Sequence, residues 1–474
     1  MPAAPPPAKR SWWLEEALAH PEFVGPETPP LRGDTNADVV ILGGGYTGMW
    51  TAHFLKEREP SLDVALLEAD ICGGGPSGRN GGFCDGWWGH IGDMVKTYGE
   101  ADAIELLMTC GRSPAEIGAW CERHGVDAWW RPGGDLAVAT SPNAEGRWEG
   151  TLEVARALGV QDEYAVLSPD EVQQRCASPM FGGGMFIADA STVHPARLVR
   201  GLRRVLLEQG VRIFERTPVT RFKAGRPAVA ETPGGNVHAG EAVIGLGAWA
   251  TWWKAFKPKL TVRGSYMVVT APTPEKLEEI NWTGGEAVRD FRSSIHYLRT
   301  TADGRIAFGL GGLQPDLARS IDPRYDYDER FAARVAADLV KMFPTFRDVP
   351  IERGWGGPIN VSGFTMPFFG SMGTAGNVHY GLGYTGNVTG PSHLGGKILA
   401  ALALHADDGF TRLAVVSREP KRFPPEPIRS PGMLVANAAI RRKDDLEDAG
   451  RRVDPLTGFV ARMPRRLGFS LGPR

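Results

Sequence analysis

The sequence predicts an α/β protein with two lobes, and three observations lead to this expectation. A short apolar run at 38–42 is followed by glycines, a helix-compatible stretch and a second strand-like run at 63–68, which is the order of a βαβ unit. Residues 260–312 instead alternate apolar and polar side chains in several runs, a pattern typical of antiparallel sheet. The chain has 474 residues, more than a single hydrophobic core usually holds.

The composition excludes several classes of protein. Hydrophobic residues make up 42% and charged residues 23%, as in ordinary globular proteins. The net charge of -2 gives no general attraction to nucleic acid or to an anionic membrane, and no apolar run reaches the roughly 20 residues that span a bilayer. The five cysteines lack paired spacing, which disfavours a disulfide framework and a metal site. Because the N-terminus also lacks a secretory apolar core, we expect a cytoplasmic protein without nucleic-acid or membrane partners.

The pattern along the chain predicts the limits of the lobes. Ser11 can cap a short helix over 12–20, and further helices are expected over 101–125, 194–210, 330–343 and 391–405. From about Arg441 the sequence predicts an exposed tail or a packing arm. The expected units are an arm at 1–36, a first lobe at 37–100, 175–250 and 350–410, a second lobe at 101–174 and 251–349, and a C-terminal extension at 411–474.

The glycines after the first strand form a dinucleotide fingerprint. Gly43 permits a tight turn, Gly45 lets a pyrophosphate approach the backbone, and Gly48 lets helix and strand pack closely. Glu68 ends the second strand, where a carboxylate accepts hydrogen bonds from ribose hydroxyls. Strand, glycines, helix and acid together predict a Rossmann-type unit. The alternative is a glycine-rich turn that binds nothing.

A second glycine-rich loop distinguishes the two common dinucleotides. The loop at 73–82 begins five residues after Glu68 and offers backbone N–H groups, the Ser77 hydroxyl and the Arg79 guanidinium. A simple nicotinamide dehydrogenase has no need of such a segment. The sequence therefore predicts FAD as the cofactor.

These motifs resemble those of a known family. The fingerprint, Glu68, the run 77–82, the run 247–249 and the late turn 383–386 occur in the order seen in the D-amino-acid oxidase superfamily. The Ser-Gly-Arg-Asn-Gly-Gly form at 77–82 looks most like the γ-glutamylputrescine oxidase branch. The resemblance covers roughly 37–400 and implies a Rossmann-type FAD-binding lobe, a mainly antiparallel-sheet substrate lobe, and the oxidation of an amine or amino acid.

The fingerprint and the resemblance together imply a set of FAD-binding residues. No cysteine follows Cys176, so the late cysteine that binds FAD covalently in some relatives is missing, and non-covalent FAD is expected with Cys84 as the remaining alternative. The late turn continues with Asn387-Val388 where the family usually has His-Gly. The implied residues are Gly43, Gly45, Tyr46, Thr47, Gly48, Glu68, Ala69, Ser77, Gly78, Arg79, Asn80, Gly81, Gly82, Val219, Gly247, Ala248, Gly383, Tyr384, Thr385, Gly386 and Asn387.

A flavin that oxidises an amine accepts the electrons itself, so the protein has mainly to position the substrate. Tyr297 and Arg299 share one face of an expected strand and are candidates for binding a substrate carboxylate, with a solvated sheet face as the alternative. His379, close to the late turn, is a candidate for setting the protonation of the amine, with a structural histidine as the alternative. Trp87 and Trp355 flank the flavin-loop motifs and are candidates for apolar walls or a cation–π surface.

The predicted reaction is hydride transfer from the carbon next to nitrogen to flavin N5, giving an imine. Dioxygen is the expected acceptor and hydrogen peroxide the expected second product. Three alternatives stay open: a flavin dehydrogenase with another acceptor, a nicotinamide-only enzyme and a non-catalytic flavin-binding module.

Overall fold

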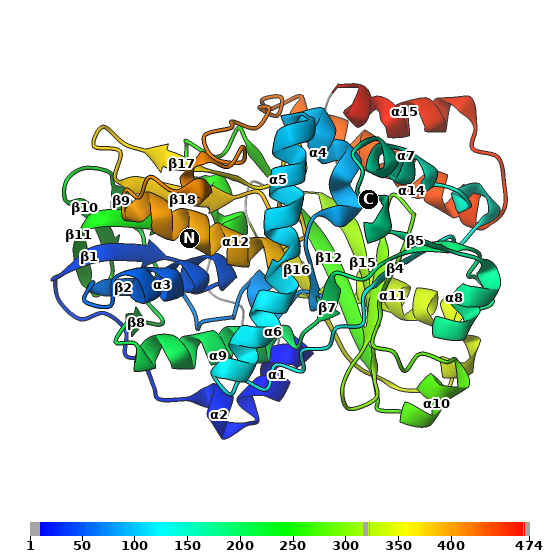
Figure 1. Ribbon diagram of the computed structural model, residues 1–474, viewed down its shortest axis with the longest axis horizontal. Coiled ribbons are helices and arrows are strands. Elements are labelled where there is room, and N and C mark those ends of the chain that lie inside the picture. The colour runs from blue at the N-terminus through cyan, green and yellow to red at the C-terminus, as the bar shows by residue number, and fades with distance from the viewer. Residues whose placement is uncertain (1–9, 316–320, 322, 468, 470–474) are drawn as a thin grey trace.

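The protein has two lobes, each built on its own sheet (Figure 1). The computed structural model describes residues 10–315, 321, 323–467 and 469. The sheet of the first lobe is mainly parallel and that of the second is mainly antiparallel. This arrangement confirms the predicted α/β class with two lobes.

The first sheet has a parallel centre in which β18, β11, β1, β2 and β8 are neighbours in that order. β17 pairs antiparallel with β18 at one edge, and β10 and β9 extend antiparallel from β11. The bounds are β1 Thr35–Leu42, β2 Val64–Leu67, β8 Arg212–Phe214, β9 Arg221–Lys223, β10 Ala228–Thr232, β11 Gly235–Ile244, β17 Phe368–Met372 and β18 Val378–Leu382.

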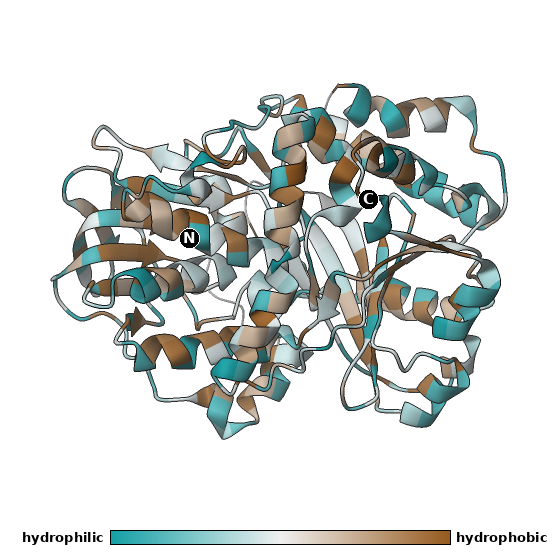
Figure 2. Ribbon diagram, viewed as in Figure 1, coloured by the Kyte–Doolittle hydropathy of each residue, from teal (hydrophilic) through white to brown (hydrophobic). Residues whose placement is uncertain are grey.

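Both faces of this sheet are buried, as expected of parallel strands. Val39 and Ile41 of β1 lie in the hydrophobic cluster formed with the helices α3, α9 and α12, whereas Val40 and Leu42 lie in a second cluster with β10 and β11. Figure 2 shows the hydrophobic colours that run along β1. The helices are α3 Tyr46–Arg58, α9 Pro195–Glu208 and α12 Thr389–Ala403.

The second sheet runs in the order β16, β12, β15, β14, β13, β4, β6 and β5, and its pairs are antiparallel except for β13 with β4. Leu298 and Phe308 of this sheet share a core with Val335 and Leu339 of α11. The bounds are β4 Asp135–Val138, β5 Ala165–Leu167, β6 Gly184–Ile187, β12 Leu260–Thr270, β13 Ala287–Asp290, β14 His296–Thr300, β15 Ile306–Pro315 and β16 Ile351–Ser362; the helices are α8 Pro169–Arg175, α10 Pro274–Glu279 and α11 Glu329–Met342.

A helical region and a two-stranded ribbon lie between the lobes (Figure 1). The single helix expected over 101–125 is divided at Ser113-Pro114, where Pro114 occupies the first turn of a new helix because it has no N–H to donate. α5 and α6 then pack against α12 of the first lobe. The elements are α4 Ile91–Tyr98, α5 Glu100–Gly111, α6 Ser113–Arg123, α7 Glu149–Ala157, β3 Phe83–Asp85 and β7 Ala190–Thr192.

The described residues of both terminal segments form helices, the first of which the sequence predicts over 12–20. In the expected N-terminal arm, α1 Trp12–Leu18 is capped by Ser11 and packs on α9 and β16, and α2 Pro21–Val24 follows. In the expected extension, α13 Gly409–Arg412 is followed by α14 Arg429–Asp448 and α15 Pro455–Arg466, which pack against each other. Residues 1–9, 468 and 470–474 of these expected segments lie outside the described residues.

The strand pairings shift two of the expected lobe limits. β6 and β16 lie within the ranges 175–250 and 350–410, which were expected to belong to the first lobe, yet both are strands of the second sheet. β6 pairs with β4, and β16 pairs along its length with β12. Short apolar runs carry no record of their partner, so the sequence could not assign these strands. No helix of the described part of the chain is both long enough and apolar enough to cross a membrane.

Candidate active site

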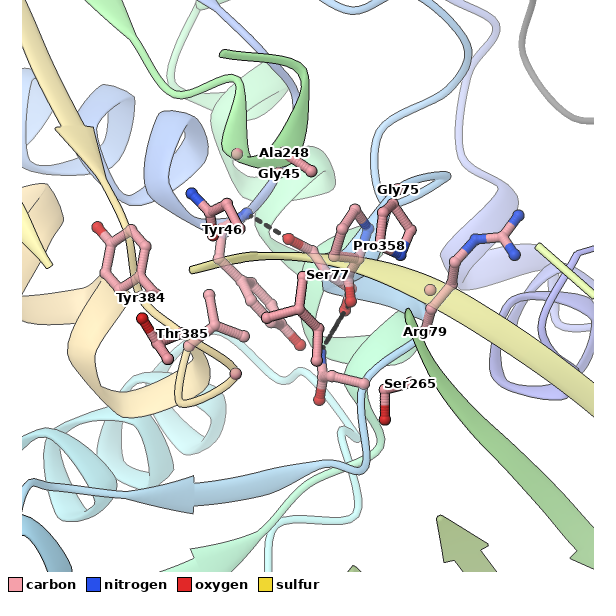
Figure 3. A pocket seen from close by; sticks show the side chains of 18 of the residues that line it. Gly45, Tyr46, Gly75, Ser77, Arg79, Ala248, Ser265, Pro358, Tyr384 and Thr385 are labelled. Carbon is pink, nitrogen blue, oxygen red and sulfur yellow. Dashed lines mark hydrogen bonds between the residues drawn. The ribbon is translucent and has the colours of Figure 1, made fainter. Parts of the chain in front are cut away.

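A cavity of about 320 Å³ lies between the two sheets and is lined by residues of both. The first lobe contributes the glycine turn after β1, the end of β2 and the loop at 74–81. The second contributes β12, β14, β15 and β16, and the turn before α12 closes another side. Figure 3 shows this arrangement, with Gly45 and Ala248 on one side, Tyr384 and Thr385 on another, and Ser265 below.

The glycine turn after β1 forms one end of the cavity. Gly43 has a φ of +111°, and a Cβ there would lie 2.6 Å from the carbonyl oxygen of Gly245, so only glycine fits. α3 begins at Tyr46, and the first N–H groups of a helix have no partner within it. The Ser77 hydroxyl accepts a hydrogen bond from the Tyr46 N–H at 2.9 Å (Figure 3). The site thus presents backbone donors and a helix N-terminus, which suit a diphosphate.

Glu68 ends β2 beside this turn. Its two carboxylate oxygens accept hydrogen bonds from the N–H groups of Gly44 at 2.8 Å and Asp70 at 2.9 Å. Burial raises the pKa of Glu68 to about 7, although both of these hydrogen bonds lower it. Sugar hydroxyls that donate to the same oxygens would stabilise the ionised form. The position therefore fits the ribose of a dinucleotide.

The loop that follows is fastened to the second lobe by Arg79. Its Nε donates to the carbonyl oxygen of Gly74 at 3.0 Å and its Nη1 to that of Gly356 at 3.1 Å, while the indole Nε1 of Trp355 donates to the carbonyl oxygen of Arg79 at 2.8 Å. Burial lowers the pKa of Arg79, and the nearby Asp326 opposes that shift. Trp355 therefore positions the loop from outside the cavity.

The late turn forms a further wall of the cavity. Thr385 has a φ of +55°, and its hydroxyl donates to the carbonyl oxygen of Gly383 at 2.9 Å. Asn387 donates from Nδ2 to Gly86 O at 3.1 Å and to Asp85 Oδ2 at 3.3 Å. Because α12 starts at Thr389, directly after this turn, its N-terminal partial charge lies beside this part of the cavity. A group that gains negative charge would be stabilised there.

The second sheet supplies a polar wall. Tyr297 lines the cavity, its hydroxyl lies 2.7 Å from Ser265 Oγ, and burial raises its pKa to about 12, so it stays neutral. Arg263 of β12 also lines the cavity and donates to Gly312 O at 3.1 Å and to the Oδ1 of Asn437 in α14. Burial lowers the pKa of Arg263 to about 10, which leaves it a cation at neutral pH.

A second set of polar side chains lies near the late turn. Asp85 and Arg289 both line the cavity, and Arg289 Nη2 forms a buried ion pair with Asp135 Oδ2 at 2.7 Å. Burial and the neighbouring Asp135 raise the pKa of Asp85 to about 7, and Arg289 opposes this. Burial and Arg289 lower the pKa of His90, which also lines the cavity, to about 4. The wall thus combines a cation with a carboxyl group that titrates near neutrality.

Most of the FAD-binding residues expected from sequence line this one cavity. They are Gly43, Gly45, Tyr46, Thr47, Glu68, Ala69, Ser77, Arg79, Asn80, Gly81, Val219, Gly247, Ala248, Tyr384, Thr385, Gly386 and Asn387. Gly48, Gly78, Gly82 and Gly383 lie behind the lining, where a Cβ would collide with backbone or side chains. Cys84 is buried and is not among the lining residues.

Of the five catalytic candidates, the structure places Tyr297 in the lining and the other four outside it. Arg299 is 1% exposed, donates to the carbonyl oxygens of Val193 and Thr300, and lies over the ring of Trp13. Burial lowers its pKa to about 9. Arg299 and Tyr297 are two residues apart in β14, so the strand pattern puts them on the same side. Tyr297 packs against Gly81 and Gly309 and lines the cavity, whereas Arg299 does not line it.

His379 and Trp87 are also placed away from the cavity. His379 lies within β18, where its ring nitrogens contact Ser371 Oγ at 2.7 Å and Glu241 Oε2 at 3.0 Å. Trp87 is 1% exposed and belongs to the core with α5 and α6. The side chains of His379 and Trp87 are therefore held by contacts within the fold, and the sequence does not reveal these contacts.

Several lining residues were missed by the reading of the sequence. Arg289 lies eight residues before Tyr297 in a segment rich in polar residues, and Asp85 lies three residues after the glycine-rich loop, so proximity to a motif was the available signal for Asp85. Arg263 and Ser265 lie in a strand without a motif. Ile440 of α14 lines the cavity from within the expected C-terminal extension, 411–474, and no local signal marks it.

Comparison with known proteins agrees with this geometry. The family model described as FAD dependent oxidoreductase (DAO) matches residues 38–402. The chain is 29% identical to gamma-glutamylputrescine oxidoreductase of Escherichia coli over 401 residues, which cover 82% of this chain and 89% of that protein. It is 28% identical to a probable oxidoreductase OrdL of Rhizobium meliloti over 401 residues, covering 83% and 88%.

Solved structures share the fold. Glycine oxidase from Geobacillus kaustophilus superposes with a TM-score of 0.65 at 20% identity, covering 79% of this chain and 96% of that one. L-Proline dehydrogenase from P. horikoshii gives 0.64 at 20% identity, covering 81% and 96%. The glycine turn after β1, Glu68 at the end of β2 and the family match over most of the chain all indicate an FAD-binding protein. The chain belongs to the DAO family of FAD-dependent oxidoreductases.

Proposed function

We propose that this protein oxidises an amine or an amino acid, with dioxygen as the electron acceptor. The observation that carries the proposal is the continuity of the cavity, in which the dinucleotide cradle opens onto a wall that holds Tyr297, Arg263, Arg289 and Asp85. When bound, FAD supplies the two-electron acceptor for such a substrate. The names of the curated relatives that act on amines support the substrate class.

Each part of the cradle has a role in holding FAD. The backbone N–H groups of Gly45 and Thr47 and the Ser77 hydroxyl would hold the pyrophosphate, and Glu68 the ribose hydroxyls. Val219 would contact the adenine end. The turn at 384–387 would lie beside the ring, with the N-terminus of α12 favouring negative charge there. None of the five cysteines lines the cavity, and we propose that FAD is held non-covalently.

The polar wall would orient the substrate. Arg263 and Arg289 offer guanidinium groups to a carboxylate, and the neutral Tyr297 offers a hydroxyl that can donate or accept. Asp85 would contact the nitrogen of the amine. Because its pKa lies near neutrality, Asp85 can accept a proton from a bound ammonium group and so favour the free amine that is oxidised.

An anaerobic panel of amines and amino acids tests this function. We expect at least one member to bleach the visible absorbance of the bound flavin, and dioxygen to restore it with release of hydrogen peroxide. If no member of a broad panel reduces the flavin, the proposed substrate class is wrong. If the bleached protein is restored by an artificial dye but not by dioxygen, the protein is a dehydrogenase and the proposed acceptor is wrong.

A further inference from the structure

The helix α15 presents its large apolar side chains to solvent. Leu456 is 72% exposed, Phe459 46% and Met463 41%, and Leu467, directly after the helix, is 56% exposed. These positions are spaced by three or four residues, so they lie on one side of the helix. We call these four residues the outer face of α15.

The side of α15 that packs on the protein is formed by smaller residues instead. Thr457 is buried, and Gly458, Val460, Ala461 and Pro464 are half-buried. A surface helix of a globular protein normally turns its large apolar residues inward. In α15 the largest apolar side chains are the exposed ones, so packing among the described residues does not account for the outer face. On the neighbouring helix α14, Leu434 and Val435 are also exposed, as is Ile428 directly before it.

Positive charge surrounds the outer face. Residues 449–467 contain five arginines, Arg451, Arg452, Arg462, Arg465 and Arg466, all exposed, against one acid, Asp454. The guanidinium of Arg466 lies 5.2 Å from the centre of the Phe459 ring. The whole chain carries a net charge of -2, so this segment is a strongly basic exception within a slightly acidic protein.

We propose that α15 is a docking surface for an anionic lipid bilayer. Exposed apolar side chains beside arginines are what a helix needs to lie in the interface of such a membrane, where the side chains enter the acyl region and the cations meet the headgroups. Pairing with a second copy through this face would bring two basic segments together. A nucleic acid would meet the charges but gain little from leucine and methionine side chains. This inference revises the expectation of no membrane partner and concerns the surface only, without a transmembrane segment.

The test is flotation of the full-length, FAD-loaded protein with vesicles. We expect binding to phosphatidylglycerol–phosphatidylcholine vesicles that weakens with added salt, and little binding to pure phosphatidylcholine. The variant L456S/F459S/M463S should lose at least about tenfold in partition coefficient, because three apolar side chains no longer enter the interface. The matched control M108S/V166S removes comparably exposed apolar residues elsewhere on the molecule and should bind as the parent does.

A charge variant separates the two contributions. R462Q/R466Q should weaken binding to anionic vesicles and reduce the salt dependence, with the flavin absorbance unchanged. Equal partition of the parent and the serine variant, or no flotation with either lipid, would overturn the proposal. The proposal would also be overturned if the protein does not float with vesicles but forms a dimer, or binds a nucleic-acid duplex, and the serine variant abolishes that association. Since no readout involves substrate turnover, failure here is distinct from failure of the proposed oxidase activity.

Discussion

At the scale of single residues, the carboxyl groups of the cavity carry the pH dependence. Glu68 and Asp85 both have pKa values raised to about 7, chiefly because burial disfavours their charged forms. They lie in different parts of the site, Glu68 at the end of β2 and Asp85 beside the late turn. Their titrations should therefore be read out by different measurements, FAD binding for one and turnover for the other.

Glu68 makes FAD binding depend on pH. If ribose hydroxyls donate to the carboxylate, the bound form has a lower pKa than the free form, so binding releases a proton. FAD affinity should then fall as the pH drops below about 7, by up to about tenfold per pH unit. Titration of the apoprotein with FAD, followed by flavin fluorescence, measures this. Glu68→Gln should bind more weakly at pH 8 and with no pH dependence in this range; an unchanged slope in this variant would refute the role of Glu68.

Asp85 should control the acid limb of turnover. Because the ionised carboxylate is needed to accept the proton, kcat/KM should fall as the pH drops below about 7. Asp85→Asn should lower kcat/KM about 100-fold at pH 8 and remove this limb. The exposed Asp102→Asn on α5 serves as a control. An Asp85→Asn enzyme that keeps the acid limb, with normal FAD content, would show that another group titrates.

At the scale of elements, α14 closes the cavity from a part of the chain beyond the family match. Ile440 lines the cavity and Asn437 accepts from Arg263, while the buried carboxylate of Asp444 accepts from the N–H groups of Ser293 at 3.2 Å and Ser294 at 2.8 Å. Ser293 and Ser294 belong to the loop that carries lining residues of the polar wall. The helix thus positions a wall of the site as well as covering it.

Replacing Asp444 should loosen this wall. Asp444→Ala leaves the buried N–H group of Ser294 and the part-buried one of Ser293 without their acceptor, at an expected cost of about 1–3 kcal/mol in the free energy of unfolding. The neighbouring Asp445 makes an exposed ion pair with Arg334, so Asp445→Ala should cost about 0.5 kcal/mol or less. Urea denaturation of the two holoproteins compares them. Equal losses would contradict the bridging role of Asp444.

At the scale of the whole molecule, α1 lies where the two lobes meet. Trp13 is completely buried, with its ring centre 4.8 Å from that of His194 in the first lobe and 6.1 Å from that of Trp355 in the second. Glu16 of the same helix binds His194 at 2.8 Å and Arg197, and Glu15 contacts Arg353 of β16 at 2.5 Å. The N-terminal helix therefore fastens the lobes together behind the cavity.

Trp13→Ala should weaken this junction. The cavity left by the indole is expected to cost about 3–5 kcal/mol in the free energy of unfolding, and Trp13→Phe clearly less. Because Trp355 holds the Arg79 loop, the Ala variant should also release FAD at a lower temperature. Thermal unfolding monitored by both tryptophan and flavin fluorescence tests this. Retention of the parent FAD-release temperature would show that α1 does not support the loop.

The βαβ unit, the family and FAD as the cofactor could all be predicted from the amino-acid sequence. Its signals are local: Gly43 must adopt a positive φ beside Gly245, and Glu68 must end a strand near it, so backbone geometry demands these residues at this spacing. Such constraints can be read from a few consecutive residues. The antiparallel pattern at 260–312 was equally local and was confirmed by β12, β14 and β15.

Which side chains share the cavity follows from the packing of distant segments. Asp85, Arg263 and Arg289 come from three strands, and Ile440 comes from α14. Arg299 and His379 show the converse, since each was a candidate from the sequence yet is occupied by buried backbone or carboxylate partners. The alternation along a strand predicts which side chains share a side, but not what that side packs against. The packing partner is set by the burial of apolar surface over the whole chain.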